Sequence, residues 1–297
     1  MKTTFCRAET CDQLKMVGLL FEPEAASKIG ILHLHGRAGG FYANAFLDAM
    51  AGIYTAAGFG FLTVNLRGHD QIADFRVGDT DQIKRIGQAF DVFEECVLDI
   101  GAWLDFFRSR GYEKIILQGY SQGGGKAVYF LNEKPQADVV ALVLMSPADA
   151  AGLLKKFDPR NFEKDLAEAE VMVAQGRGNE LLPRPIRATY YVSAKSLADE
   201  FGKNTKANIF PVFENGNFEK LEKIKIPILA FYGSKENLCI NSPKEDLAII
   251  ASHLKNQNSK TAIIDGADHT CHKCENQVAE LIEAWLKEVL QYGKRKR

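Results

Sequence analysis

The 297-residue chain is 46% hydrophobic and 25% charged, and its 37 Lys and Arg residues nearly balance its 38 Asp and Glu residues, for a formal net charge of -1. This composition is ordinary for a globular protein, and the length suffices for one large domain or for a domain with an insertion. The balanced charge gives no support to a nucleic-acid partner. The basic run at residues 294–297 is expected to be a solvated chain end.

Targeting segments are not evident in the sequence. Residues 1–7 contain no apolar core of signal-peptide length. No stretch approaches about 18 consecutive apolar residues, so no membrane span is expected. A cytoplasmic location is therefore the default expectation, and in that compartment the six cysteines are expected to be mostly reduced thiols.

The first half of the chain alternates short apolar runs with longer amphipathic ones. A parallel strand that is buried on both faces reads as a continuous apolar run, and four such strands are predicted: Ile29–Leu34, Phe59–Asn65, Lys114–Gln118 and Val139–Met145. Three helices are predicted between and after them: Ala43–Ala57, Phe90–Arg110 and Ser121–Leu131. An antiparallel strand pair at the sheet edge is predicted for Thr3–Phe21, and a long polar loop for Arg67–Gly87. The alternation indicates an α/β fold with a largely parallel sheet that helices cover on both faces.

The alternation breaks after residue 147. Residues 150–222 contain no clear buried strand, but they include a charged amphipathic helix at Phe162–Gln175 and several aromatic residues. We predict that 150–222 is an insertion packed over the sheet, whose aromatic residues either line a pocket or form the insertion's own core. The sheet then resumes with four elements: strand Ile226–Tyr232, helix Pro243–Leu254, strand Thr261–Ile264 and helix Asn276–Leu290.

A serine lies at the junction of a predicted strand and a predicted helix. The sequence Gly119-Tyr120-Ser121-Gln122-Gly123 fits the pattern G-x-S-x-G, in the strand-turn-helix setting that holds a serine exposed on a sharp turn. Side chains at the two glycine positions would crowd this turn, and the helix N-terminus supplies N–H groups and partial positive charge. The pattern predicts Ser121 as a nucleophile. The alternative is a glycine-rich turn with a structural serine.

A serine nucleophile needs a base, and the base needs a carboxylate. His269 follows the last predicted strand, at the sheet edge where loops after parallel strands gather, so we expect it beside Ser121. His272 is a rival further along the same connection, and a surface histidine is the other alternative. Glu236 is the only carboxylate in the first loop after strand 226–232, and it completes the order serine, acid, histidine. Asp149 is a competing acid, and Glu236 as a plain surface charge is a further alternative.

Backbone N–H groups are expected to stabilise the developing oxyanion. One donor is the N–H of Gln122, the residue after the nucleophile. The second is expected from the glycine-containing loop 35–40 after strand 29–34, and we assign it to Arg37. A simple tight turn is the alternative for this loop.

Five short motifs resemble landmarks of the α/β-hydrolase superfamily and occur in that family's order: His35-Gly36, Asn65-Leu66-Arg67-Gly68-His69, Gly119-Tyr120-Ser121-Gln122-Gly123, Gly233-Ser234-Lys235-Glu236 and Gly266-Ala267-Asp268-His269. The resemblance implies an eight-stranded, mostly parallel sheet with a mainly helical cap inserted after the sixth strand. The core would comprise 1–149 and 223–297, and the cap 150–222. It also implies that Ser121 is the nucleophile, His269 the base and Glu236 the acid, with Arg37 and Gln122 as oxyanion donors. Many members have Asp at the acid position, so the longer Glu236 departs from the pattern.

The chain resembles single-domain esterases and acyl hydrolases, so we expect two-step hydrolysis of a small-molecule carboxylic ester through an acyl-serine. This chemistry needs no metal and no organic cofactor. The same residues also serve amide, peptide or thioester hydrolysis and acyl transfer to another alcohol. A non-catalytic binding protein that kept the fold is the alternative from a different class.

Two other motifs are interpreted structurally. Cys271 and Cys274 flank His272 and lie near His269, which resembles a metal or redox site, but a second C-x-x-C half is absent. We interpret them as bystander thiols. Arg67-Gly68-His69-Asp70 is expected to form a loop beside the pocket, with the guanidinium of Arg67 paired to a nearby carboxylate.

Overall fold

A computed structural model describes residues 1–186 and 189–292, so the basic run at 294–297 lies outside the described residues. One eight-stranded sheet has the order β1-β2-β4-β3-β7-β8-β9-β10. The first two strands pair antiparallel with each other, β2 pairs antiparallel with β4, and all other pairs are parallel. The prediction of a mostly parallel eight-stranded α/β sheet is confirmed. The strand bounds are β1 Lys2–Glu9, β2 Lys15–Glu22, β3 Ile29–Leu34, β4 Gly60–Val64, β7 Lys114–Tyr120, β8 Val139–Met145, β9 Ile228–Gly233 and β10 Lys260–Ile264.

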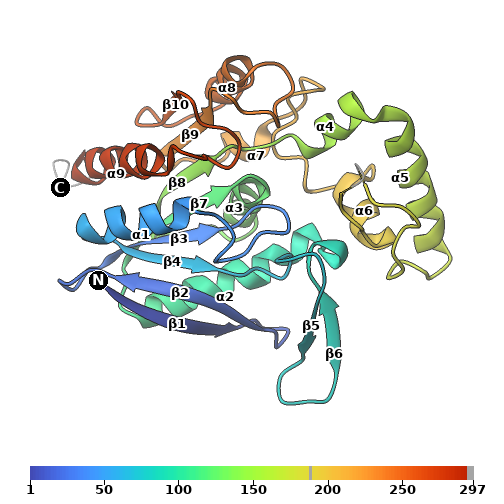
Figure 1. Ribbon diagram of the computed structural model, residues 1–297, viewed down its shortest axis with the longest axis horizontal. Coiled ribbons are helices and arrows are strands. Elements are labelled where there is room, and N and C mark those ends of the chain that lie inside the picture. The colour runs from blue at the N-terminus through green and yellow to red at the C-terminus, as the bar shows by residue number, and fades with distance from the viewer. Residues whose placement is uncertain (187–188, 293–297) are drawn as a thin grey trace.

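Helices cover both faces of this sheet (Figure 1). One face packs against α1 and α9, and the other against α2, α3 and α8. Strand β3 is apolar except for His33 because both of its faces are buried. Ile31 packs in the core with α1 and α9, whereas Leu32 and Leu34 pack in the core with α2, α3 and α8. The helix bounds are α1 Phe46–Ala56, α2 Cys96–Ser109, α3 Gln122–Glu133, α8 Pro243–Ser252 and α9 Glu275–Tyr292.

The segment between β8 and β9 is helical and extends to one side of the sheet (Figure 1). Its described residues form four helices: α4 Ala150–Phe157, α5 Pro159–Ala174, α6 Ala194–Phe201 and α7 Glu219–Glu222. An apolar cluster separate from the two sheet cores joins α4, α5 and α6, and its buried members all lie between residues 154 and 197. The segment is tied to the rest of the chain near α6, where Ser193 N–H donates to the Ala89 carbonyl (2.6 Å) and Ser196 Oγ donates to the Asp91 carbonyl (2.5 Å).

Two sequence predictions for residues 67–110 are wrong. The expected loop Arg67–Gly87 contains an antiparallel hairpin of β5 Ala73–Arg76 and β6 Ile83–Ile86, which projects from the sheet (Figure 1). Each strand is only four residues long and half polar, so its pattern is too short to predict a strand. The expected helix from Phe90 begins only at Cys96, because two 3₁₀ turns precede it and Val92 between them is extended (φ -103°, ψ 112°).

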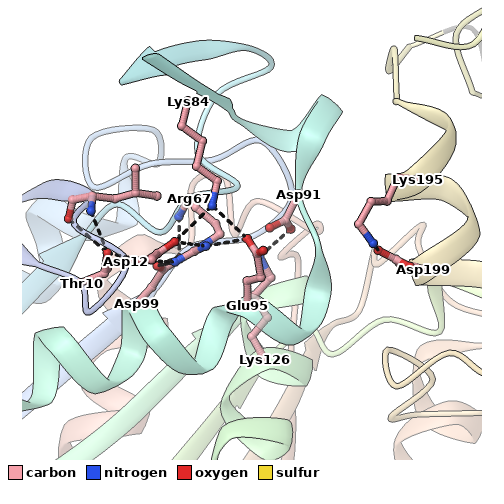
Figure 2. Close-up of polar contacts among 11 residues, drawn as sticks. Thr10, Asp12, Arg67, Lys84, Asp91, Glu95, Asp99, Lys126, Lys195 and Asp199 are labelled. Atoms are coloured by element: carbon pink, nitrogen blue, oxygen red, sulfur yellow. Dashed lines mark hydrogen bonds and ion pairs between the residues drawn. The ribbon is translucent and has the colours of Figure 1, made fainter. Parts of the chain in front are cut away.

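Arg67 is buried and is the centre of an ion-pair network (Figure 2). Its guanidinium donates to Asp99 (2.8 Å), Asp12 (3.1 Å) and Glu95 (2.5 Å), and its backbone N–H also donates to Asp99 (2.8 Å). Lys84 from β6 also donates to Asp12 (3.1 Å). Burial opposes ionisation of Asp12, but the hydrogen bonds from Arg67 and other donors outweigh it and lower the pKa of Asp12. The expected pairing of Arg67 with a carboxylate is confirmed, and the network joins the β1–β2 turn, α2 and the hairpin.

Removal of the Arg67 charge tests this network. Arg67→Met leaves Asp99, which is fully buried, without its cation, so the free energy of unfolding should fall by about 3–5 kcal/mol. Arg85→Met is the matched control, because Arg85 pairs with Asp74 on the exposed hairpin; its unfolding midpoint should stay near that of the wild type. Urea unfolding followed by circular dichroism measures both. Equal effects of the two substitutions would contradict a structural role for the Arg67 network.

Two histidines of the β3 region are buried and neutral. His33 is 0% exposed and His35 is 3% exposed. Burial lowers the pKa of His33 from 6.5 to about 3 and the pKa of His35 from 6.5 to about 4. The Nε2 atom of His35 accepts the backbone N–H of Leu66 (3.0 Å), and its Nδ1 lies 2.7 Å from the carbonyl of Gly36. A neutral His35 therefore connects the ends of β3 and β4.

These histidines predict acid sensitivity of the fold. Below pH 6.5 the unfolded chain binds protons at both residues, whereas the folded chain does not until about pH 4 and below. Stability is therefore lost as the pH falls, with a slope of up to about 1.4 kcal/mol per pH unit for each histidine. Urea unfolding of wild type and His33→Leu between pH 7 and pH 5 measures the slope, which should be smaller in the variant. Equal pH dependence of the unfolding free energy in the two proteins would refute a buried, neutral His33.

Candidate active site

Ser121 occupies a strained turn between β7 and α3. Its backbone has φ 52° and ψ -120°, a conformation that non-glycine residues rarely adopt. The Ser121 N–H donates to the carbonyl of Met145 at the end of β8 (2.8 Å), and α3 begins at the next residue, Gln122. The hydroxyl is thus held on a sharp turn at the N-terminus of a helix.

Close backbone packing makes this turn depend on glycine. A β-carbon at Gly119 would lie 2.5 Å from the carbonyl carbon of Gly123, and one at Gly123 would lie 2.4 Å from the carbonyl oxygen of Leu34. A β-carbon at Gly36 would lie 3.1 Å from Cβ of Ser121. The loop after β3 therefore packs directly on the serine, as the sequence pattern required.

His269 lies beside Ser121, in the loop between β10 and α9. Its Nε2 is 3.2 Å from Oγ of Ser121, and its Nδ1 is 2.9 Å from both carboxylate oxygens of Glu236. Because an ionised carboxylate only accepts hydrogen bonds, the proton of a neutral imidazole belongs on Nδ1. This tautomer leaves the lone pair of Nε2 facing the serine hydroxyl, the arrangement that proton removal from Ser121 requires.

Glu236 is held in a buried position by the loop after β9. Its side chain is fully buried, and Oε1 also accepts the backbone N–H of Leu238 (2.8 Å). The loop is bonded to its neighbour after β10, because Ser234 N–H donates to the carbonyl of Ile264 and Lys235 N–H donates to that of Ala267, each at 2.8 Å. Glu236 and His269 therefore come from two loops that are fixed to each other.

The two alternatives from the sequence, Asp149 for the acid and His272 for the base, make contacts outside this group. Asp149 is buried, and its carboxylate accepts the N–H groups of Gly152 (2.7 Å) and Phe213 (2.9 Å), which makes it the N-cap of α4. The side chain of His272 is 67% exposed and lies 3.9 Å from Glu275. Within residues 1–186 and 189–292, neither rival makes a hydrogen bond to the serine or to the histidine beside it.

The side chains of the two predicted oxyanion-donor residues both contact one residue that the sequence analysis missed. Arg37 forms an ion pair with Glu200 of α6, and Gln122 Nε2 donates to the same carboxylate oxygen (2.9 Å). Among the described residues, the backbone N–H groups of Arg37 and Gln122 have no hydrogen-bond acceptor. No motif distinguishes Glu200 from the other carboxylates of amphipathic helices, so no signal in the sequence points to it.

A cavity of about 550 Å³ contains Ser121 and His269 in its wall. Much of its other lining comes from the β8–β9 segment and is apolar, including Leu153, Leu154, Ile186, Val192, Leu197 and Phe210. Among the described residues, the charged and amide side chains of the wall are Arg37, Asn44, Gln122 and Glu200. The aromatic residues of the segment divide between the two expected roles, because Tyr190, Phe201 and Phe210 line the cavity whereas Phe162 belongs to the segment's own core.

The cysteine pair near His269 shows no metal-site geometry. Cys271 and Cys274 are buried free thiols, and burial raises the pKa of Cys271 to about 12, which keeps it protonated. No group of three or more His, Cys, Asp or Glu residues suited to a metal ion is found in the part of the chain that the structure describes.

None of the helices in the described ranges has the length and apolarity of a membrane span.

Comparison with known proteins identifies similar folds. A family model described as alpha/beta hydrolase fold matches residues 31–179. Est1E from Butyrivibrio proteoclasticus, solved with ferulic acid, is 17% identical over 96% of this chain and 99% of its own, with a TM-score of 0.67. The Pyrococcus furiosus esterase Pf2001 is 16% identical, covering 97% and 91% of the two chains, with a TM-score of 0.62. The alpha/beta hydrolase GrgF from Penicillium sp. sh18 is 15% identical, covering 98% and 100%, with a TM-score of 0.68. A search of curated proteins finds no significant match.

The packing of the serine turn predicts opposite effects for two glycine substitutions. Gly123→Ala places a methyl group against the backbone of β3, so we expect a loss of about 1–3 kcal/mol in unfolding free energy. Gly52→Ala in α1 is the control, because a β-carbon there has open space and alanine favours a helix by about 0.5–1 kcal/mol. Thermal unfolding distinguishes them. A neutral Gly123→Ala would show that the turn is not closely packed.

Proposed function

The chain belongs to the α/β-hydrolase fold family, and on that premise we propose that it is a serine-dependent hydrolase of carboxylic esters. The proposal depends on one observation, the continuous hydrogen-bonded line from Ser121 through His269 to the buried carboxylate of Glu236. This line is the arrangement that activates a serine hydroxyl for attack on a carbonyl carbon. The esterases among the structures of similar fold make ester hydrolysis the first activity to test.

Each residue has a defined role in the proposed two-step reaction. His269 takes the proton from Ser121 as Oγ attacks the carbonyl carbon, and Glu236 holds the imidazole in the required tautomer and stabilises its charged form. The N–H groups of Arg37 and Gln122 donate to the oxyanion of the tetrahedral intermediate. His269 then returns the proton to the leaving alcohol, and a water molecule releases the acid by the same route.

We also propose that residues 150–222 are a cap over the site, with 1–149 and 223–297 as the core. The separate apolar cluster of this segment and its large share of the cavity lining support that division. The cavity volume of about 550 Å³ suits a small-molecule substrate rather than a folded protein. The apolar lining favours the acyl or alcohol chain of an ester.

Substitution of the three residues tests the proposal. Ser121→Ala should lower kcat on p-nitrophenyl esters by a factor of about 10⁴ or more. Glu236→Gln should lower it by about 10³–10⁴, because the amide no longer fixes the tautomer. Asp149→Asn is the control, and we expect its activity to stay within a few-fold of the wild type.

A fluorophosphonate probe separates an enzyme from a non-catalytic binding protein. Wild type should be labelled, and Ser121→Ala should not, as measured by intact-protein mass spectrometry. Equal labelling of both proteins, or none of the wild type, would count against a serine hydrolase. A labelled serine without turnover of any p-nitrophenyl ester would instead favour amide, peptide or thioester hydrolysis or acyl transfer.

A further inference from the structure

The cavity contains a charged pair that the proposed reaction does not use. Arg37 comes from the loop after β3 and Glu200 from α6, and their side chains are 20% and 8% exposed. One guanidinium nitrogen pairs with one carboxylate oxygen, and Gln122 Nε2 donates to that same oxygen. The guanidinium also lies over the ring of Phe201, 5.9 Å from its centre. Both charged residues line the cavity beside the serine.

This pair has unused hydrogen-bonding capacity. A guanidinium carries five N–H donors, and in the described part of the chain only Nη2 of Arg37 has an acceptor, on Glu200. The other carboxylate oxygen of Glu200, Oε2, has no donor there. None of these atoms is among the described polar atoms that are sealed from solvent without a partner. They are accessible, and because their residues form the cavity wall, they are available to a bound molecule.

The Arg37–Glu200 pair carries no net charge, which decides what kind of group fits. Arg37 and Glu200 cancel, and so do their neighbours Lys126 and Asp91, which lie 2.6 Å apart and are almost fully buried. A carboxylate or an ammonium group would be attracted by one member of the Arg37–Glu200 pair and repelled by the other. An apolar group would displace water and leave the spare donors and acceptor unsatisfied. A neutral group that both donates and accepts satisfies both partners.

We infer that Arg37 and Glu200 form a polar subsite for a neutral hydrogen-bonding group, a carboxamide or a hydroxyl, carried on an otherwise apolar substrate chain. The inference rests on the proposed function, because it describes the substrate of that same site. Arg37 donates to the oxygen of the substrate group, and Glu200 Oε2 accepts its N–H or O–H. The two side chains determine specificity and take no part in bond making.

Three isosteric p-nitrophenyl esters test the subsite: the adipamate, the hydrogen adipate and the 6-methylheptanoate, together with their homologues one and two methylenes longer. Calorimetric titration of Ser121→Ala gives their affinities without turnover. We expect the carboxamide to bind about tenfold tighter than the carboxylate and the methyl isostere at one or more of the lengths. Tightest binding of the methyl isostere at every length would overturn the inference.

Removal of the carboxylate should change the ranking in a defined direction. In Ser121→Ala carrying Glu200→Leu, the charge of Arg37 is unpaired, so the ratio of carboxylate affinity to carboxamide affinity should rise by about tenfold or more. The matched control is Asp199→Leu, because Asp199 is the next residue of α6 and pairs with Lys195 (2.7 Å) outside the cavity lining (Figure 2). Its ratio should equal that of Ser121→Ala alone.

A second variant is needed in case Glu200→Leu does not fold. Glu200→Gln removes the same charge with little change of shape, and thermal unfolding shows which variants are folded. An unchanged affinity ratio in the folded Glu200 variants would overturn the inference. Failure of the proposed function is a separate outcome: wild type that releases no p-nitrophenolate, while Ser121→Ala still prefers the carboxamide, would contradict ester hydrolysis and support the subsite.

Discussion

The direct packing of backbone on backbone at the start of α3 is the constraint on which the candidate site depends. The first turn of this helix presses against the end of β3, and only glycine fits at 119 and 123. Ser121 and the loop that contains Arg37 are therefore fixed to each other through the main chain rather than through flexible side chains. The imidazole and the carboxylate come from two neighbouring loops at the same edge of the sheet, and these loops are also joined by main-chain hydrogen bonds. A parallel sheet thus supplies a rigid frame for groups that are far apart in the sequence.

Three basic residues of this protein pair with carboxylates from distant segments of the chain. Arg67 joins carboxylates from the β1–β2 turn and α2, Lys126 of α3 meets Asp91, and Arg37 meets Glu200 of α6. A buried charge without its partner is costly, so each pair favours one relative placement of the segments that carry it. The third pair differs from the other two because it faces a cavity. It joins α6 to the loop after β3, and in the proposed subsite it also presents polar atoms to a bound molecule.

The sequence predicted those parts of the fold whose signal is local. Val139–Met145 is apolar throughout because both faces of β8 are buried, and its predicted bounds agree with the structure. The positions of Ser121, His269 and Glu236 follow from which strand each residue succeeds. The hairpin within residues 67–87 was missed because each of its strands has only four residues, too few for a strand pattern to be recognised. The helix from Phe90 was predicted too long, because buried Phe93 extends the apolar pattern through residues that form 3₁₀ turns. Glu200 was missed because its partners lie more than 70 positions away.

The most direct test of the proposed site is the crystal structure of the protein after reaction with a p-nitrophenyl alkylphosphonate. In that structure we expect phosphorus bonded to Oγ of Ser121, with a phosphoryl oxygen within about 3 Å of the N–H groups of Arg37 and Gln122. We also expect that the imidazole of His269 stays hydrogen-bonded to Glu236 and that the alkyl chain enters the cavity under α6. A phosphonate attached to another residue, or a phosphoryl oxygen that points away from both N–H groups, would contradict the proposed site.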